Sequence, residues 1–326
     1  LGFTFAQDTQ VGDYTISEVV DGMRTVEHLA GTTEIPADPQ RVMTLHDIGL
    51  TTMALHLGFQ PFASQGRLVD GKEYFYLGKG FNSEGLELAG TYPDFDLERI
   101  LGLEPDLIIG RVWEEDIYDE LSAIAPTVLV PVDIMSDDIL FSEYMANILN
   151  RMDRHEAFVR EYESIIDRIQ RLVPNPEEIT VTSVVIQDAE PTIMIFGGVL
   201  PIDKVIRDVG FSKREAIVDM ETQFAAENMT DRFRLSIEAL PEIDADFIFN
   251  NYYLAPDGNY DSLAITEDFM SGPFWNSLFA VQNNQYIQVE SNQTYGDGMF
   301  YLLNAANMVL THVAERGFVT NEEGWD

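Results

Sequence analysis

The sequence predicts an α/β protein that consists of two similar lobes joined by one long helix. Two observations support this prediction. Short apolar segments alternate with helical segments in both halves of the chain, which is typical of a parallel sheet with helices on both faces. An amphipathic helical segment of about twenty residues separates the two halves.

The first half of the chain begins with a predicted β-hairpin. Residues 14–34 alternate in polarity, and Asp21-Gly22 within them is a hairpin turn signal. A loop rich in Gly, Tyr and Phe is expected over 65–90, and Asp94 or Asp96 is expected to cap the helix that follows. The other elements expected here are strands at 41–47, 61–64, 106–110 and 127–131 and helices at 48–58, 94–104 and 114–125.

A helical pattern dominates residues 137–173, with a break expected near 151–153. The segment 154–173 carries its apolar residues on one face, namely Phe158, Tyr162, Ile165, Ile166, Ile169 and Leu172. At about 1.5 Å per residue this segment forms a rod of roughly 30 Å. Pro174 and Pro176 are expected to end it.

The second half repeats the alternation. The stretches "FDLERILGLEPDLIIG" (95–110) and "RLSIEALPEIDADFIFN" (234–250) both run from a helix with a glutamate through a proline and an aspartate to an apolar strand. Strands are expected at 180–187, 192–197, 246–251 and 285–290, and helices at 201–210, 235–243, 273–281 and 298–316.

These patterns predict two Rossmann-like lobes. We expect an N-terminal lobe at 14–150, an inter-lobe helix at 154–173 and a C-terminal lobe at 176–318. Ligands of open α/β sheets bind beyond the carboxyl ends of the strands, so a ligand cleft is expected between the lobes.

The charge of the chain excludes several kinds of partner. Asp and Glu number 56 against 19 Lys and Arg, which gives a net charge of −37. Such a surface repels phosphate backbones and anionic lipid headgroups, so we expect no nucleic acid and no membrane partner. Salt screens dense like charge, so a saline habitat is indicated. The absence of cysteine excludes disulfides, thiol catalysis and Cys-ligated metal sites.

The beginning of the chain resembles the end of a targeting segment. Thr4-Phe5-Ala6 forms a small–x–small pattern before polar sequence, as at the cleavage site of a secretory signal peptide. We expect cleavage after Ala6, with an ordinary frayed terminus as the alternative. No apolar run approaches the ~20 residues that span a bilayer, so membrane insertion is not expected.

Five stretches resemble the iron-siderophore type of periplasmic substrate-binding protein, the helical-backbone class III that serves ATP-binding-cassette (ABC) importers. They are "GTTEIPADPQRVMTLHDIGLTTMALHLGFQPFAS" (31–64), "LERILGLEPDLIIGR" (97–111), "IAPTVLV" (124–130), "LSIEALPEIDADFIF" (235–249) and "GPFWNSLFAVQNNQYIQV" (272–289). The resemblance covers roughly residues 24–316 and depends on the order and spacing of the stretches.

The resemblance implies two roles. In this family a glutamate on each lobe forms salt bridges with arginines of the permease dimer, and the matching residues are Glu98 and Glu238. In the catecholate branch an arginine directly after the "PDLII" strand binds the ferric complex, and here that residue is Arg111. The alternative for Arg111 is a pair with Glu114 or Glu115.

Further ligand contacts are nominated from the ends of the predicted strands. Aromatic rings can cover flat chelators, and tyrosine or histidine can complete a ferric coordination sphere, although no direct metal ligand is predicted. Together with Arg111 the nominated residues are Arg67, Tyr252, Tyr253, Trp113, His46, Asn250 and Tyr295. The second arginine of the catecholate pattern is missing from 196–211, which has only Lys204 and Arg207, so a hydroxamate or carboxylate chelate of lower charge is also considered.

The function expected from these residues is capture of a ferric siderophore in the periplasm by a monomer that delivers it to an importer. A haem- or cobalamin-binding protein of the same fold is the alternative. A bare metal ion is disfavoured because the five histidines are scattered along the chain. An enzyme is not expected, since no Walker loop, GxSxG, HExxH or GxGxxG is present. No cofactor is expected beyond iron(III) carried as the siderophore complex.

Overall fold

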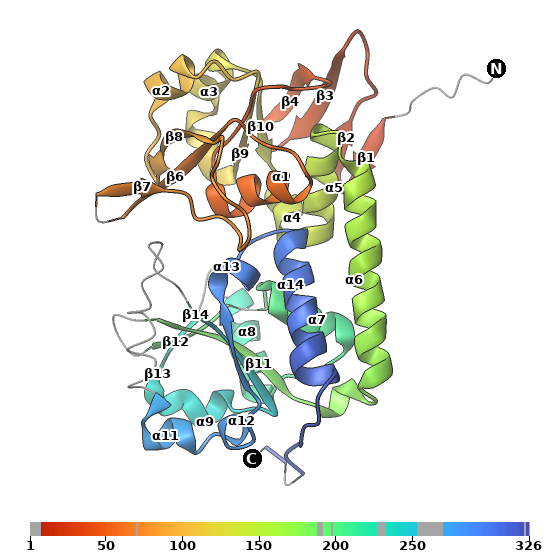
Figure 1. Cartoon of the computed structure of the whole chain (residues 1–326), viewed down its shortest axis with the longest axis vertical. Helices are drawn as coiled ribbons and strands as arrows, with labels where there is room; N and C mark the ends of the chain where they lie inside the picture. The colour runs from red at the N-terminus through yellow and green to blue at the C-terminus, as the bar shows by residue number, and fades with distance from the viewer. Residues whose placement is uncertain are drawn as a thin grey trace, which may run out of the picture. The chain divides into compact units, whose positions relative to one another are not determined.

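The computed structural model divides the chain into two compact units. Unit 1 comprises Leu1–Val159 with Asp297–Phe300, and unit 2 comprises Arg160–Gly296 with Tyr301–Asp326. The residues that the structure describes are 8–69, 71–187, 192–196, 198–226, 233–252, 270–322 and 324–325. Each unit combines a sheet that contains parallel strands with helices, as Figure 1 shows, so the predicted α/β class is confirmed.

The main sheet of unit 1 has the strand order β10-β9-β5-β6-β7, and β8 pairs with β6. All of its pairings are parallel except that of the β6–β7 hairpin. The bounds are β5 (Val42–Thr44), β6 (Ala63–Val69), β7 (Lys72–Tyr74), β8 (Glu87–Tyr92), β9 (Leu107–Arg111) and β10 (Thr127–Val130). The loop expected over 65–90 is therefore wrong in part, because it contains most of β6, all of β7 and the start of β8.

The helices predicted for unit 1 occur in the predicted order, but each is shorter than the sequence predicted. Ile100 of α2 and Leu121 of α3 share one buried cluster with Met43 and Ile108 of the sheet. The Asp96 carboxylate accepts the Arg99 N–H at 2.9 Å, which confirms Asp96 as the cap of α2. The helical elements are the π-helical turn η1 (Asp47–Thr51), α1 (Thr52–His56), α2 (Leu97–Gly102), the 3-10 turn η2 (Val112–Ile117), α3 (Tyr118–Ile124), α4 (Val132–Ser136) and α5 (Asp138–Ile148).

A separate antiparallel sheet of four strands precedes the main sheet. Asp21 and Gly22 both have positive φ, at 51° and 81°, between the bridged residues Val20 and Met23. Positive φ at both central residues is the geometry of a type I′ hairpin, so the predicted turn is confirmed. The strands are β1 (Thr9–Val11), β2 (Tyr14–Ile16), β3 (Met23–His28) and β4 (Gly31–Pro36).

The sheet of unit 2 has the order β13-β12-β11-β14-β15. Strands β11 (Val181–Gln187), β14 (Phe247–Tyr252) and β15 (Tyr286–Glu290) are parallel. The expectation of a fully parallel sheet is wrong here, because β12 (Thr192–Ile195) and β13 (Phe233–Ser236) pair antiparallel. The helix expected at 235–243 is wrong at its start, since Ser236 still belongs to β13.

The other elements of unit 2 surround this sheet. Trp275 is buried with Ile248 and Leu278 in the cluster that packs on β14. The helical elements are η3 (Pro176–Glu178), α7 (Pro201–Val209), α8 (Glu215–Ala226), η4 (Ile237–Ala239), α9 (Leu240–Ile243), α11 (Pro273–Asn276), α12 (Phe279–Gln282), α13 (Ser291–Thr294), α14 (Met299–Val309) and η5 (Leu310–Ala314).

Helix α6 (Met152–Leu172) contains the boundary between the units, after Val159. Four residues of its predicted apolar face are buried, namely Phe158, Tyr162, Ile166 and Ile169. Leu172 is 46% exposed, so its assignment to that face is wrong; Val173, directly after the helix, is buried instead.

The segment Asp297–Phe300 joins unit 1 from a distant part of the sequence. The Gly298 N–H donates to the buried carboxylate of Asp138 in α5. The Phe300 ring lies 5.5 Å from the ring of His56, measured between centroids. A side chain at Gly78 would collide with Phe300, so close packing requires glycine there.

His28 predicts a dependence of stability on pH. It is buried, and its Nδ1 accepts the N–H groups of Ala30 and Leu129, so the neutral ring carries its proton on Nε2 toward Thr33. Burial lowers the pKa of His28 from 6.5 to about 4. The neutral form is favoured in the fold, so its stabilisation is complete above pH 6.5 and is lost as the pH falls toward 4.

We expect His28→Asn to flatten this dependence, because asparagine can accept at the Nδ1 position without titrating. Between pH 7 and 5 the free energy of unfolding of the wild type should fall by about 2 kcal/mol more than that of the variant. Urea unfolding at a series of pH values measures the difference. If the free energy of unfolding changes equally with pH in the two proteins between pH 7 and 5, His28 is not the source of this dependence.

Candidate functional site

The candidate site of unit 1 is built at the carboxyl ends of parallel strands. His46 and Asp47 follow β5, Arg67 lies near the end of β6, and Tyr92 and Arg111 are the last residues of β8 and β9. Arg67 and Tyr92 are direct partners in the register of β6 and β8. The topology therefore brings residues from four separate segments to one edge of the sheet.

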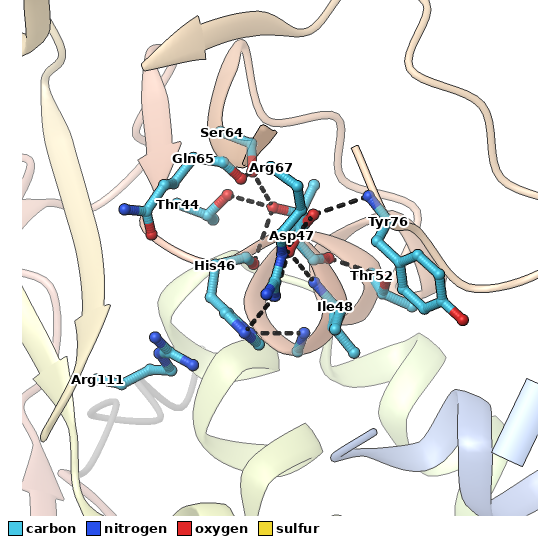
Figure 2. A network of polar contacts seen from close by, with 12 residues as sticks. Thr44, His46, Asp47, Ile48, Thr52, Ser64, Gln65, Arg67, Tyr76 and Arg111 are labelled. Carbon is cyan, nitrogen blue, oxygen red and sulfur yellow. Dashed lines mark hydrogen bonds and ion pairs between the residues drawn. The ribbon is translucent and has the colours of Figure 1, made fainter. Parts of the chain in front are cut away.

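The carboxylate of Asp47 is the centre of a polar network, which Figure 2 shows. It accepts from Arg67 Nε at 3.0 Å and Nη2 at 2.9 Å, and from the N–H groups of Ile48 at 2.9 Å and Tyr76 at 2.7 Å. Asp47 is almost fully buried, and Arg67 is partly exposed. A carboxylate with this many donors holds the guanidinium in one plane and one direction.

His46 caps the turn η1. Its Nδ1 accepts the Gly49 N–H at 3.1 Å, which places the proton of the neutral ring on Nε2. Burial lowers the pKa of His46 well below 6.5, and the charges of Arg111 and Arg67 lower it further. His46 Nε2 lies 3.0 Å from Arg67 Nη2, so this contact brings two donors together and adds little attraction. Arg67 is therefore held by Asp47 rather than by His46.

Arg111 is buried at the end of β9 and pairs with Glu114. Glu114 accepts from the Arg111 backbone N–H and, at 3.1 Å, from Arg111 Nη2. Burial raises the pKa of Glu114, and the charge of Arg111 opposes that rise. The pair that the sequence left as an alternative is thus present. The pair leaves Arg111 Nε without a hydrogen-bond partner. This atom is buried, since only 6% of the Arg111 side chain is exposed.

Aromatic rings lie over both guanidinium groups. The Tyr92 ring centroid is 4.9 Å from Arg67 Cζ and 5.7 Å from Arg111 Cζ. The Trp113 ring centroid is 4.6 Å from Arg111 Cζ, and 65% of Trp113 is exposed. His46 meets Tyr92 edge to face at 6.1 Å. These rings offer an exposed apolar surface beside buried donors.

The sequence reasoning nominated Arg67, Arg111, Trp113 and His46, and unit 1 brings them together. It missed Tyr92, which contacts three of the four. The available signal was its position at the end of an apolar alternation, but β8 was not predicted, so no strand end was assigned there.

The candidates in unit 2 have different surroundings. Asn250 is fully buried and donates to the Tyr286 hydroxyl at 2.8 Å, so it has a contact within the sheet. The Tyr295 ring lies 5.5 Å from Phe196. Tyr252 ends β14, but its side chain is outside the described part of the chain, as is the whole of Tyr253. Their roles as ligand contacts stay predictions.

Glu98 and Glu238 occupy similar positions in the two units. Glu98 is exposed in the first turn of α2, before β9, and Glu238 is exposed in η4, before β14. A hydrogen bond with the Ser236 side chain lowers the pKa of Glu238.

The described residues show neither a group of metal ligands nor a membrane-spanning helix. Among them, no three His, Asp or Glu side chains are grouped so that they could hold a metal ion. None of the helices within those residues combines the length and the apolar character needed to cross a bilayer.

Comparison with known proteins gives a consistent family. The profile of the family described as "Periplasmic binding protein" matches residues 82–292. "Probable siderophore-binding lipoprotein YfiY" of Bacillus subtilis (strain 168) is 30% identical over 280 residues, which cover 82% of this chain and 80% of that protein. "Iron(3+)-hydroxamate-binding protein YxeB" of the same organism is 25% identical, with 81% of this chain and 76% of that protein covered.

Solved structures show the same fold. Staphylococcus aureus SirA complexed with staphyloferrin B has a TM-score of 0.68 and 25% identity, and the match covers 89% of this chain and 98% of that chain. FeuA from Bacillus subtilis has a TM-score of 0.72 at 18% identity, covering 88% of this chain and 99% of that one.

The network around Asp47 predicts a large loss of stability when its carboxylate is removed. Asp47→Ala leaves Arg67 and the buried N–H of Tyr76 without their acceptor, and we expect the free energy of unfolding to fall by about 3 kcal/mol. Asp116→Ala removes an exposed carboxylate of the same unit and should change it by less than about 0.5 kcal/mol. Chemical unfolding measures both, and equal effects would exclude the central role of Asp47.

Proposed function

The chain belongs to the periplasmic binding protein family, and from this membership we propose that it captures a ferric siderophore and delivers it to the permease of an ABC importer. It is a binding protein and not an enzyme. The names of its relatives support the ligand class, since YfiY is described as siderophore-binding and SirA was crystallised with staphyloferrin B. Haem or cobalamin is not favoured by these relatives.

One observation of this chain carries the proposal. Two guanidinium groups and two exposed rings converge at the carboxyl ends of β6, β8 and β9, and the buried Arg111 Nε has no partner. Arg67 is partly exposed beside these rings, so its guanidinium can donate to a ligand oxygen. Arg111 Nε is enclosed by protein atoms, and a ligand oxygen could become its missing partner only after neighbouring side chains move. The rings of Tyr92 and Trp113 would cover the organic part of a chelate.

The proposal extends to residues whose roles are untested. Tyr252, Tyr253 and Tyr295 stay candidates for aromatic contacts with the ligand, as does Asn250 for a polar contact. The cleft expected from the sequence also stays a prediction. Glu98 and Glu238 would form salt bridges with the permease dimer, where exposed charges mainly fix orientation and association rate. The protein would act as a secreted monomer in the periplasm, and the expected cleavage after Ala6 lies outside the described residues.

Binding of a ferric siderophore should quench tryptophan emission, because Trp113 is exposed beside Arg111. We expect Arg111→Ala to weaken binding by about 1.5–3 kcal/mol, the range for a hydrogen bond to a charged group. Arg99→Ala, which changes an arginine on the surface of α2, should leave affinity unchanged. Fluorescence titration with ferric hydroxamate, catecholate and carboxylate siderophores, haem and cobalamin tests this. The ligand class is refuted if no ferric chelate quenches emission.

If Glu98 and Glu238 dock on the permease, their removal should stop transport without changing the affinity for the ligand. The double variant Glu98→Ala, Glu238→Ala should abolish uptake of radioactive ferric siderophore by cells that carry the importer, while affinity measured on the purified protein stays the same. The variant Glu120→Ala, Glu242→Ala changes two other exposed glutamates of the same two units and should retain uptake. Normal uptake by the first variant would remove these two residues from the interface.

A further inference from the structure

The two arginines of the site each have their own buried counterion. Asp47 neutralises Arg67, and Glu114 neutralises Arg111. Both carboxylates have only about 1% of their side chains exposed, and both also accept backbone N–H groups. A ligand anion could replace them only by breaking these bonds and burying an unpaired carboxylate, which costs several kcal/mol by order of magnitude. The carboxylates therefore stay in place when a ligand binds.

A third carboxylate, that of Asp297, lies beside the turn η1. Asp297 Oδ2 is 3.7 Å, and His46 Nδ1 is 3.3 Å, from the point where a Cβ at Gly49 would stand. His46 is neutral at ordinary pH, because its buried ring has a lowered pKa. Each of the two guanidinium charges is thus matched by one buried carboxylate. The site offers hydrogen-bond donors and rings without excess positive charge.

The charge of the whole chain acts in the same direction. A net charge of −37 produces a negative potential around the protein, which slows the approach of polyanions and lowers their concentration near the surface. A neutral chelate does not experience this barrier.

We propose that the site selects ferric chelates of zero or low negative charge, such as tris-hydroxamates, and discriminates against tris-catecholates. A ferric tris-hydroxamate is neutral, whereas a ferric tris-catecholate is a trianion. Hydroxamate oxygens would accept from the partly exposed guanidinium of Arg67, and the Tyr92 and Trp113 rings would cover the chelate. This inference rests on the proposed function and specifies its ligand class.

The first experiment compares chelates of different charge with the wild-type protein. Ferrichrome, a neutral tris-hydroxamate, and ferric enterobactin, a tris-catecholate, are titrated by calorimetry at low and at physiological salt. We expect ferrichrome to bind at least about a hundredfold more tightly at physiological salt, with a smaller preference as added salt screens the charge. Equal or tighter binding of ferric enterobactin would overturn the inference and leave the proposed function standing. If neither chelate binds, and a ferric carboxylate siderophore does not bind either, the proposed function itself fails.

A second experiment isolates the counterion. Glu114→Gln keeps the size of the side chain and an acceptor for Arg111 but removes the negative charge. We expect the affinity for ferric enterobactin relative to that for ferrichrome to rise at least about tenfold in this variant compared with the wild type. Glu115→Gln, an exposed neighbour, should change neither affinity by more than about twofold.

If Glu114→Gln does not fold, the comparison of the two chelates on the wild-type protein tests the inference by itself. An unchanged relative affinity for ferric enterobactin in the folded variant would overturn the inference.

Discussion

The candidate site depends on the buried carboxylate of Asp47. A buried carboxylate is stable only when it is paired and hydrogen-bonded, and its donors here come from η1, from Arg67 on β6 and from the N–H of Tyr76 after β7. One group therefore fixes the turn after β5, the direction of Arg67 and the course of the chain beyond the β6–β7 hairpin. The position of Arg67 against the Tyr92 ring follows from the same bonds.

Much of this arrangement could be predicted from the sequence, for a physical reason. Polar residues at the ends of apolar strands were nominated because parallel strands place their carboxyl ends at one edge. This rule found His46 and Arg67 and agrees with Arg111, which the family resemblance implied. It could not find Tyr92, because β8 lies in a Gly-rich stretch with weak alternation. The antiparallel pairing of β12 and β13 was also inaccessible, since pairing direction is decided by distant residues rather than by local pattern.

Position at a strand end does not by itself make a ligand contact. Arg111 is the last residue of β9, and Asn250 lies two residues before the end of β14 in the other unit; both are buried. Asn250 donates to Tyr286, whereas Arg111 retains a donor that no described group accepts. The distinction lies in whether all donors of a side chain are satisfied, and only three-dimensional contacts reveal it. The sequence could nominate both residues, but it could not show that Asn250 donates within the sheet whereas Arg111 Nε is buried without an acceptor.

The segment Asp297–Phe300 has a consequence for the order in which the chain folds. The Gly298 N–H satisfies Asp138, and the Phe300 ring fills the space beside Gly78 and His56, so unit 1 lacks these groups until residue 300 has been synthesised. The first half of the chain therefore cannot complete its packing as an independent N-terminal piece, as domains of a continuous segment commonly do during synthesis. A fragment that ends before residue 297 would leave this part of the core open to solvent.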